Sequence, residues 1–175
     1  HALCSTEQGY VYAVGWQGVI CVKKTDKWEY IKGGNRVAEG DPSDKVIENL
    51  PLFDVAVSEG GAIWAVGDEG RVCRCRDGIW EELVCGSKAN LRTVLPLRDG
   101  SILVGGADGI LLRYDHDSWE KIETQTDCHL VSMVQTSDGS VLLVGGRYDA
   151  NGRGFIGCIF NYSEGSWEQL SPAVK

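Results

Sequence analysis

The sequence has no long apolar run and no helical pattern. Although 43% of its 175 residues are hydrophobic, no stretch approaches the roughly 18 apolar residues of a membrane-spanning helix. No segment shows the 3.6-residue periodicity of an amphipathic helix, and 23 glycines interrupt the chain. These absences exclude a helical membrane protein and a helical solenoid. We expect a soluble globular protein without a membrane partner.

Residues typical of catalysis are also scarce. The chain has only three histidines, and it lacks a G-x-S-x-G elbow, a zinc-binding helix motif and a phosphate-cradling glycine loop. Cys73-Arg74-Cys75 is not a C-x-x-C pair, and no histidine pattern completes a zinc site around it. The turn-forming segment 149–152 (DANG) lacks the further ligands of a calcium loop. We therefore expect no enzymatic activity, no metal site and no cofactor.

Basic residues are outnumbered by acidic ones. The chain has 17 Lys and Arg against 25 Asp and Glu, which gives a formal net charge of −8 and a pI of about 4.9. This balance argues against binding nucleic acid through its phosphates. It suits a basic protein partner, and it also suits a surface whose charge only keeps the domain soluble.

A repeat is present along almost the whole chain. In three copies, a glycine precedes a Trp-Glu pair by 13 residues, and in a fourth copy the interval is 21 residues, which is eight longer. The glycine and tryptophan positions are Gly15 and Trp28, Gly67 and Trp80, Gly106 and Trp119, and Gly146 and Trp167. Such a spacing indicates one supersecondary unit that is used four times.

Each copy reads as four short β-strands. Apolar segments alternate with turns such as Asp99-Gly100 and Asp138-Gly139, which are typical of tight hairpins. Four antiparallel strands in a unit of about 40 residues form the blade of a β-propeller. We predict an all-β fold with four such blades in a single domain over 1–175, at about 1–32, 53–85, 92–123 and 129–171. Because no strand is left over to complete a split blade, the ring either closes by face packing or is part of a larger ring, and we expect the closed four-bladed ring.

Two cysteines fit this repeat as core residues. Cys21 and Cys73 lie seven residues before the repeat Trp, where the other copies have Leu112 and Phe160. Exchange with large apolar residues indicates a buried position, where cysteine acts as a small hydrophobe. We expect reduced thiols and a cytoplasmic protein.

The repeat resembles the WD40/YVTN/BNR-like propeller superfamily, especially the Asp-box (BNR) type, over nearly the whole chain. Arg76-Asp77-Gly78-Ile79-Trp80 and the segment from Tyr114 to Trp119 are degenerate forms of the Asp box, whose turn joins the third and fourth strands. The resemblance implies a propeller in which this motif is structural. It also raises sialidase chemistry, which requires an arginine cluster, a Tyr nucleophile and acidic partners, and for which four small blades leave little room.

Two insertions interrupt the repeat. One is the blade connection 33–52, and the other is 147–154, the expanded turn between the second and third strands of blade 4. Since strand direction alternates within a blade, both loop classes should emerge on one face, where binding sites evolve. The candidate partner-binding residues on that face are Trp16, Arg36, Asp41, Asp44, Asp68, Glu69, Asp108, Arg147, Tyr148, Asp149 and Arg153.

Trp16 is the aromatic residue of this set that the repeat does not explain. It occupies a turn where two other copies have Asp68 and Ala107. It is either an interface anchor or a cap that packs beneath the 33–52 connection.

These observations lead to a non-catalytic, protein-binding propeller. Its partner would be a protein, and a basic one if the negative charge serves binding, while its role would be that of an immunity protein or an assembly factor. The alternatives are a lectin-like propeller that binds glycans and a sialidase-like glycosidase. A lectin would repeat its binding residues in every blade, and the four copies share no such set outside the structural Trp.

Overall fold

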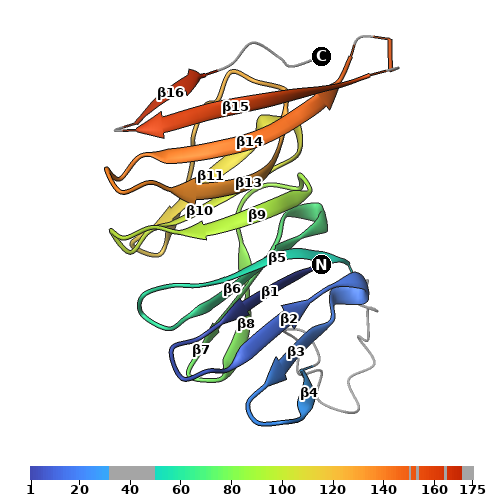
Figure 1. Cartoon of the computed structure of the whole chain (residues 1–175), viewed down its shortest axis with the longest axis vertical. Coiled ribbons are helices and arrows are strands. Elements are labelled where there is room, and N and C mark those ends of the chain that lie inside the picture. The colour runs from blue at the N-terminus through green and yellow to red at the C-terminus, as the bar shows by residue number, and fades with distance from the viewer. Residues whose placement is uncertain (32–49, 150, 153, 164, 171–175) are drawn as a thin grey trace. The chain divides into compact units, whose positions relative to one another are not determined.

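The chain folds into four antiparallel β-sheets. The computed structural model describes residues 1–31, 50–149, 151, 152, 154–163 and 165–170. Each sheet of the described part contains four strands that are consecutive in sequence, in the orders β1-β2-β3-β4, β5-β6-β7-β8, β9 to β12 and β13 to β16 (Figure 1). The predicted all-β class and the four strands per blade are confirmed. No described strand joins two sheets by hydrogen bonds, so any closure of the ring depends on packing between sheet faces.

The chain divides into two compact units, His1–Asn90 and Leu91–Lys175. Unit 1 contains blades 1 and 2. Blade 1 comprises β1 (Ala2–Ser5), β2 (Val11–Val14), β3 (Ile20–Lys23) and β4 (Trp28–Ile31). Blade 2 comprises β5 (Leu52–Val57), β6 (Ile63–Gly67), β7 (Arg71–Arg76) and β8 (Ile79–Val84).

Unit 2 contains blades 3 and 4. Blade 3 comprises β9 (Leu91–Pro96), β10 (Ile102–Gly106), β11 (Leu111–Asp115) and β12 (Ser118–Lys121). Blade 4 comprises β13 (His129–Gln135), β14 (Val141–Tyr148), β15 (Phe155–Ser163) and β16 (Ser166–Gln169).

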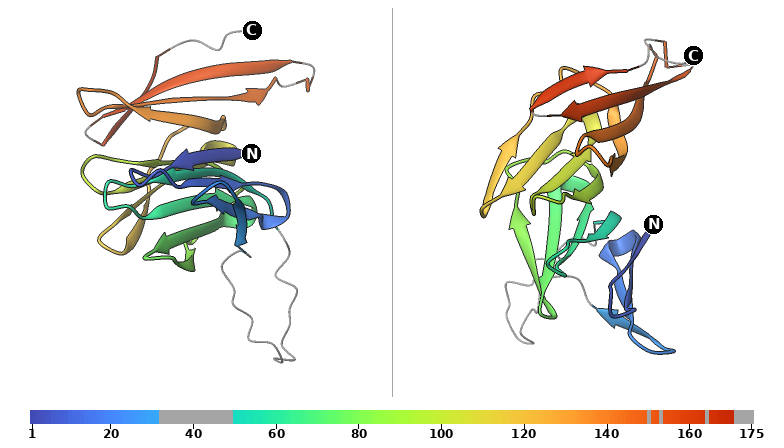
Figure 2. Two further views of the ribbon diagram at one scale, coloured as in Figure 1. Left: turned by 60° about the horizontal axis from the view of Figure 1, so that its bottom comes forward. Right: turned by 60° about the vertical axis from the view of Figure 1, so that its left-hand side comes forward.

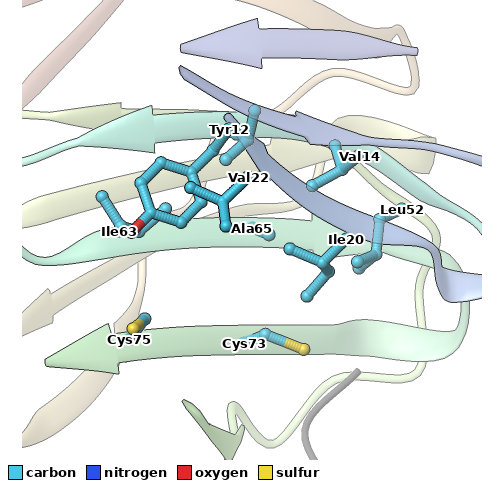
Figure 3. Close-up of a cluster of buried hydrophobic side chains, with 10 residues drawn as sticks. Tyr12, Val14, Ile20, Val22, Leu52, Ile63, Ala65, Cys73 and Cys75 are labelled. Carbon is cyan, nitrogen blue, oxygen red and sulfur yellow. The ribbon is translucent and has the colours of Figure 1, made fainter. Parts of the chain in front are cut away.

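The core of unit 1 lies between its two blades. Side chains alternate across a strand, so one face of blade 1 presents Tyr12, Val14 and Ile20 to blade 2. Blade 2 contributes Ala65 and Cys73, and Figure 3 shows the side chains of both blades in one cluster. Burial of this apolar surface, at roughly 25 cal/mol per Å², is the main favourable contribution to packing of the two sheets.

The core of unit 2 repeats this arrangement. Leu103 and Leu111 of blade 3 pack with Leu143, Cys158 and Phe160 of blade 4. Trp167, the last repeat Trp, stacks on Phe160 with ring centroids 4.7 Å apart. The repeat Trp of blade 4 is therefore half-buried and packs against the core of unit 2.

The repeat glycine marks a close approach between the first two strands of a blade. A Cβ at Gly67 would strike the carbonyl oxygen of Pro51, and one at Gly145 would strike that of His129. In the strand register, Gly67 pairs with Leu52 and Gly145 pairs with Leu130. The prediction of Gly146 as the fourth repeat glycine is therefore wrong by one residue, because two adjacent glycines made the sequence register ambiguous.

The insertion of blade 4 is a two-stranded ribbon. Arg147 and Tyr148 belong to β14 and pair with Ile156 and Phe155 of β15. Figure 2 shows these two strands running on as a long hairpin. The prediction of an expanded loop over 147–154 is therefore wrong for its first two residues, which belong to the strand. A short segment containing Gly, Asp and Asn does not show from its sequence that strand pairing continues through it. Among the described residues, no helix is long and apolar enough to cross a membrane.

Candidate functional site

In unit 1, the turns between second and third strands are tight and share one geometry. Gln17 has φ 56° and is followed by Gly18 at φ 64°, and Glu69 has φ 54° and is followed by Gly70 at φ 74°. The N–H of Val19 donates to the carbonyl of Trp16 at 3.2 Å. Two successive positive φ values define a type I′ turn, whose twist matches that of the strands it joins. The residues before Gly18 and Gly70 are thereby fixed in position at the tip of each hairpin.

These turns lie against the connection that leads to the next blade. The N–H of Leu52 donates to Gly15 at 3.0 Å, and the N–H of Gly70 donates to Ala89 at 2.9 Å. Asn90 accepts a hydrogen bond from the N–H of Glu69 at 3.1 Å through its side-chain oxygen. In unit 1, turns and blade connections therefore meet at one end of the strands, as topology predicted. We call this the loop end of the unit.

Trp16 is exposed at the loop end of unit 1. Its side chain retains 67% of its accessible surface. The ring of His1 stands edge-on to it, with centroids 4.9 Å apart, and His1 also contacts the ring of Phe53 at 5.4 Å. Trp16 thus lies on the surface of unit 1 with the ring of His1 against it.

Arg71 supports this turn from below, a role that sequence reasoning missed. Its guanidinium donates to the carbonyl of Leu50 at 3.2 Å and lies 3.7 Å from the carboxylate of Glu82. A Cβ at Gly18 would lie 2.5 Å from the same guanidinium, so the turn rests directly on it. The sequence did contain a signal for this role, because Arg71 is a charged residue at the start of an otherwise largely apolar strand segment. In the structure Arg71 is buried there, at the first position of β7.

The loop end of unit 2 has the same construction. Asp108 has φ 53° and is followed by Gly109 at φ 71°. Its N–H donates to Nδ1 of His129 at 3.1 Å, which is the contact that Asn90 makes in unit 1. Arg147 forms an ion pair with Asp127, with 3.2 Å between Nε and Oδ1. His129 and Asp127 are a second pair of residues at this end that the candidate set did not include.

The ribbon of blade 4 carries the second exposed aromatic residue. Tyr148 retains 67% of its accessible surface at the end of β14. Asp149 closes the turn: its N–H donates to Gly154 at 2.8 Å and its carboxylate accepts from the N–H of Asn151 at 3.1 Å. The role of Asp149 is therefore visible as turn formation, which is the preference of Asp in such sequences.

The described candidate residues fall into two groups, one in each unit. Trp16, Asp68 and Glu69 belong to the loop end of unit 1, and the second group belongs to that of unit 2. The members of the second group are Asp108, Arg147, Tyr148 and Asp149. Four candidates lie outside the described residues: Arg36, Asp41, Asp44 and Arg153. The expectation that both insertions share one face of the molecule stays a prediction from topology.

Several thiols are held protonated in the core. Burial raises the pKa of Cys73 to about 11, and burial together with the neighbouring Cys128 thiol raises the pKa of Cys158 to about 11. Cys73 thus has the small apolar role predicted for it, while Cys21 is only half-buried. In the part of the chain that the structure describes, no group of three or more His, Cys, Asp or Glu side chains is placed to hold a metal ion.

Four-stranded sheets in sequence order that pack face to face within each unit have the architecture of β-propeller blades. The chain is similar to a solved structure of YCF48 from Cyanidioschyzon merolae, with a TM-score of 0.69 and 15% identity over 96% of this chain and 55% of that one. It is also similar to YCF48 bound to D1 peptide, with a TM-score of 0.59 and 17% identity over 98% of this chain and 53% of that one.

This chain therefore spans about half the length of the propeller chains it resembles. No family model and no curated protein matches it. The likeness shows the propeller fold, and membership of the WD40, YVTN or BNR type stays a prediction from the sequence.

Proposed function

We propose that this chain is a non-catalytic β-propeller domain that binds a protein partner through the loop ends of its blades. One observation carries the proposal: each loop end holds an exposed aromatic side chain on a backbone fixed by hydrogen bonds, Trp16 in unit 1 and Tyr148 in unit 2. Aromatic residues on rigid scaffolds are typical anchors of protein interfaces, because they bury a large area and lose little conformational freedom.

The partner in this proposal presents a peptide segment. The solved YCF48 structure that this chain resembles holds the D1 peptide, which supports a similar mode here. Glu69 and Asp108 are exposed beside the tips of the turns and add negative charge to both loop ends. A basic segment would be attracted to them, and raising the salt concentration would then slow its association.

Of the two narrower roles, we favour an assembly factor over an immunity protein. A factor that holds one segment of its client corresponds to a propeller that binds a peptide, as the similar YCF48 structure does. The seven cysteines lie in the described part and none forms a disulfide, which supports a cytoplasmic setting for this role.

The proposed scaffold is a ring whose blades close by face packing, without a split blade. A ring closed by blades 1 and 4 of one chain is the arrangement expected from the repeat count, and a larger ring is the alternative. The two arrangements present the same loop ends to a partner, so the binding proposal holds for either.

Affinity capture from extracts of the cells that produce the protein tests this function. Trp16→Ala and Tyr148→Ala should each reduce retention of the specific partner about tenfold or more, the usual effect of losing an interface anchor. The matched controls are two exposed residues at the other end of the blades: Ile79→Ala in unit 1, at the start of β8, and His116→Ala in unit 2, in the turn between β11 and β12.

Two outcomes would contradict the proposal. Retention of every partner by the Trp16→Ala, Arg147→Ala, Tyr148→Ala triple variant would show that the loop ends are not the interface. Turnover of a fluorogenic sialoside, or binding of one glycan at several equivalent sites, would replace it by glycosidase or lectin activity.

A further inference from the structure

Two cysteine thiols lie together in the core of unit 2. Cys128 belongs to the connection between blades 3 and 4, and Cys158 belongs to β15. Both are members of the core cluster of this unit, and their exposed fractions are 2% and 4%. The proposed interface at the loop ends uses neither thiol, because both side chains are covered.

Hydrogen bonds fix the backbone of Cys128 on both sides. Its N–H donates to Oγ1 of Thr126 at 3.2 Å, and its carbonyl accepts from the N–H of Gly109 at 2.9 Å. Gly109 belongs to the tight turn of blade 3, so that turn holds the connection in place. The position of Cys128 is therefore set by blade 3, although its side chain packs in a cluster that includes residues of blade 4.

A glycine brings this connection close to β15. Gly145 of β14 pairs with Leu130 of β13 on one side and with Cys158 of β15 on the other. The carbonyl of His129 lies where a Cβ of Gly145 would be, so the start of β13 closely approaches β14 in this row. Cys128 comes directly before His129, and it therefore lies near the row that contains Cys158.

The equivalent positions in unit 1 are in contact. Leu50 precedes the leucine that pairs with the repeat glycine by two residues, as Cys128 does in unit 2. Arg71 lies on the third strand opposite that glycine, as Cys158 does in blade 4. The guanidinium of Arg71 donates to the carbonyl of Leu50 at 3.2 Å. The repeat therefore places this residue of the third strand against the preceding connection.

Of blades 2, 3 and 4, only blade 4 has cysteine at both of these positions. Blade 2 has Leu50 and Arg71, and blade 3 has Ala89 and Ile110. The fold thus accepts side chains of different size and charge here, and it requires a thiol at neither position. Two neighbouring thiols can form a covalent bond, which the residue pairs of the other blades cannot do.

The two thiols differ in their suitability for the first step of oxidation. Burial, together with a hydrogen bond to the neighbouring Cys128 thiol, raises the pKa of Cys158 to about 11. Cys158 is therefore protonated at neutral pH, and the thiolate is the nucleophilic form of cysteine. This favours Cys128 as the thiol that attacks an oxidant and Cys158 as the one that reacts second.

We propose that Cys128 and Cys158 form a modification site at which a peroxide produces a reversible disulfide. The sulfur of Cys128, as the thiolate, attacks one peroxide oxygen, the O–O bond breaks, and the departing hydroxide takes up a proton to become water. The sulfur of Cys158 then attacks the resulting sulfenic acid, whose hydroxyl group leaves as water with the proton of Cys158. The two sulfurs together lose two electrons, and the peroxide gains them.

This disulfide joins the blade connection to β15 at the base of the ribbon. Asp127, the neighbour of Cys128, forms the ion pair with Arg147 of β14. The bond closes a loop that contains β13 and β14, so it also restricts the unfolded chain. In a compartment that keeps thiols reduced, disulfides of this kind are transient and respond to oxidation. The inference does not depend on the proposed function.

Peptide mapping of the full chain is the first test. The chain is treated with hydrogen peroxide, its remaining thiols are alkylated with N-ethylmaleimide, and it is digested with trypsin without reductant. Cys128 falls in the tryptic peptide 122–147 and Cys158 in the peptide 154–175, so the disulfide joins two peptides that are otherwise separate. We expect the joined peptides in monomeric chains and their separation by dithiothreitol. Peptides that stay separate after peroxide treatment overturn the proposal.

Substitutions show whether the joined peptides come from this pair. Cys128→Ala and Cys158→Val use apolar residues that other blades have at these positions, and each should abolish the joined peptides. The matched control is Cys85→Thr, which removes another buried thiol from a blade connection and should leave them unchanged. Threonine suits this position because Cys85 donates to the carbonyl of Gly70, as Thr124 does to that of Gly109. Loss of the joined peptides in the control as well contradicts the assigned pair.

Two further measurements test the order of the steps and the state of the chain. In Cys158→Val the sulfenic acid of Cys128 has no second thiol to react with, so dimedone should label Cys128 during peroxide treatment. Circular dichroism and melting curves should show that each variant and the oxidised chain remain folded. A chain without the dimedone label overturns the proposed order. Joined peptides that form only above the melting temperature show that the bond belongs to the unfolded chain, which overturns the site.

Discussion

We call the face of a blade that is turned towards the following blade of the chain its forward face, and the opposite one its rear face. Blades 1 and 2 have nearly the same residues on their rear faces, yet within unit 1 only the rear face of blade 2 has a neighbouring blade. Ala13 and Ala65 occupy equivalent positions, as do Cys21 and Cys73. Ala65 and Cys73 are completely buried, whereas Ala13 and Cys21 are half-buried. The residue types on a sheet face therefore indicate whether the face suits packing against another blade, while the burial of those residues shows whether a blade packs there. The rear face of blade 2 is thus part of a core, whereas the rear face of blade 1 has similar residues that are less buried. Substitutions at equivalent positions measure this difference as a difference in the free energy of unfolding.

The largest difference is expected for an inserted charge. Ala65→Arg places a guanidinium in the core between blades 1 and 2, and it should reduce the free energy of unfolding by more than about 4 kcal/mol. Ala13→Arg should reduce it by less than about 1 kcal/mol in dilute solution, because its side chain can reach solvent. Urea denaturation of both variants measures the difference, and equal losses would show that the rear face of blade 1 is already covered within the chain.

Adjacent leucines in β14 make the second comparison, because they lie on opposite faces of blade 4. Leu143 is fully buried on the rear face, and Leu143→Ala should cost about 2–5 kcal/mol through lost contacts and the cavity that remains. Leu142 lies on the forward face, and Leu142→Ala should cost below about 1 kcal/mol in dilute solution. Thermal or urea unfolding of the two variants provides the test. The reverse order would mean that the two faces have been assigned the wrong way round.

The repeat Trp gives a third and smaller contrast. Trp80 packs against the core of unit 1 and lies edge-on to Tyr12, with ring centroids 6.3 Å apart, so Trp80→Ala should cost about 2 kcal/mol. Trp28 occupies the same repeat position but is exposed, and Trp28→Ala should cost below about 1 kcal/mol. Trp fluorescence during denaturation follows both. A large loss for Trp28→Ala in dilute solution would mean that blade 1 has a further neighbour there.

The smallest contrast concerns acid stability in unit 2. Hydrogen bonds from Thr136 and Ser140 lower the pKa of Asp138 from 3.8 to about 2. The carboxylate is thus favoured in the folded state, so its contribution is complete above about pH 4 and is lost as the pH falls towards 2. Asp138→Asn should flatten the decline in stability over this interval. Unfolding measured at several pH values tests this.

Asp99 provides a second test of this pH dependence. Burial raises its pKa, but hydrogen bonds from Ser101 and the charge of Arg113 outweigh burial, and the net pKa is lowered. Asp99 occupies the same turn in blade 3, so Asp99→Asn should act in the same direction. An unchanged acid profile in Asp138→Asn would show that its hydrogen bonds do not persist in solution.

The sequence was sufficient to predict blades but not their neighbours. The Trp-Glu spacing and the Asp-Gly turns predicted four units of four antiparallel strands, because hairpin periodicity is a local property. The sequence did not show whether Gly145 or Gly146 is the repeat glycine of blade 4, since either one fits the local pattern. The ion pair of Arg147 with Asp127 and the support of the Trp16 turn by Arg71 escaped prediction because they join residues that are distant in sequence. The burial of a sheet face depends on whether another sheet packs against it, and a local sequence pattern does not contain that information.

The ribbon formed by β14 and β15 has a practical consequence. Its base is fixed by the pairing of Val141–Tyr148 with β15 and by the ion pair of Arg147 with Asp127, while the described residues near its tip, Asn151, Gly152 and Gly154, are not among the core residues of unit 2. Foreign peptides grafted at that tip should therefore leave the blade intact. The domain could serve as a display scaffold, in which one hairpin is diversified while the four-stranded sheet beneath it supplies the stability.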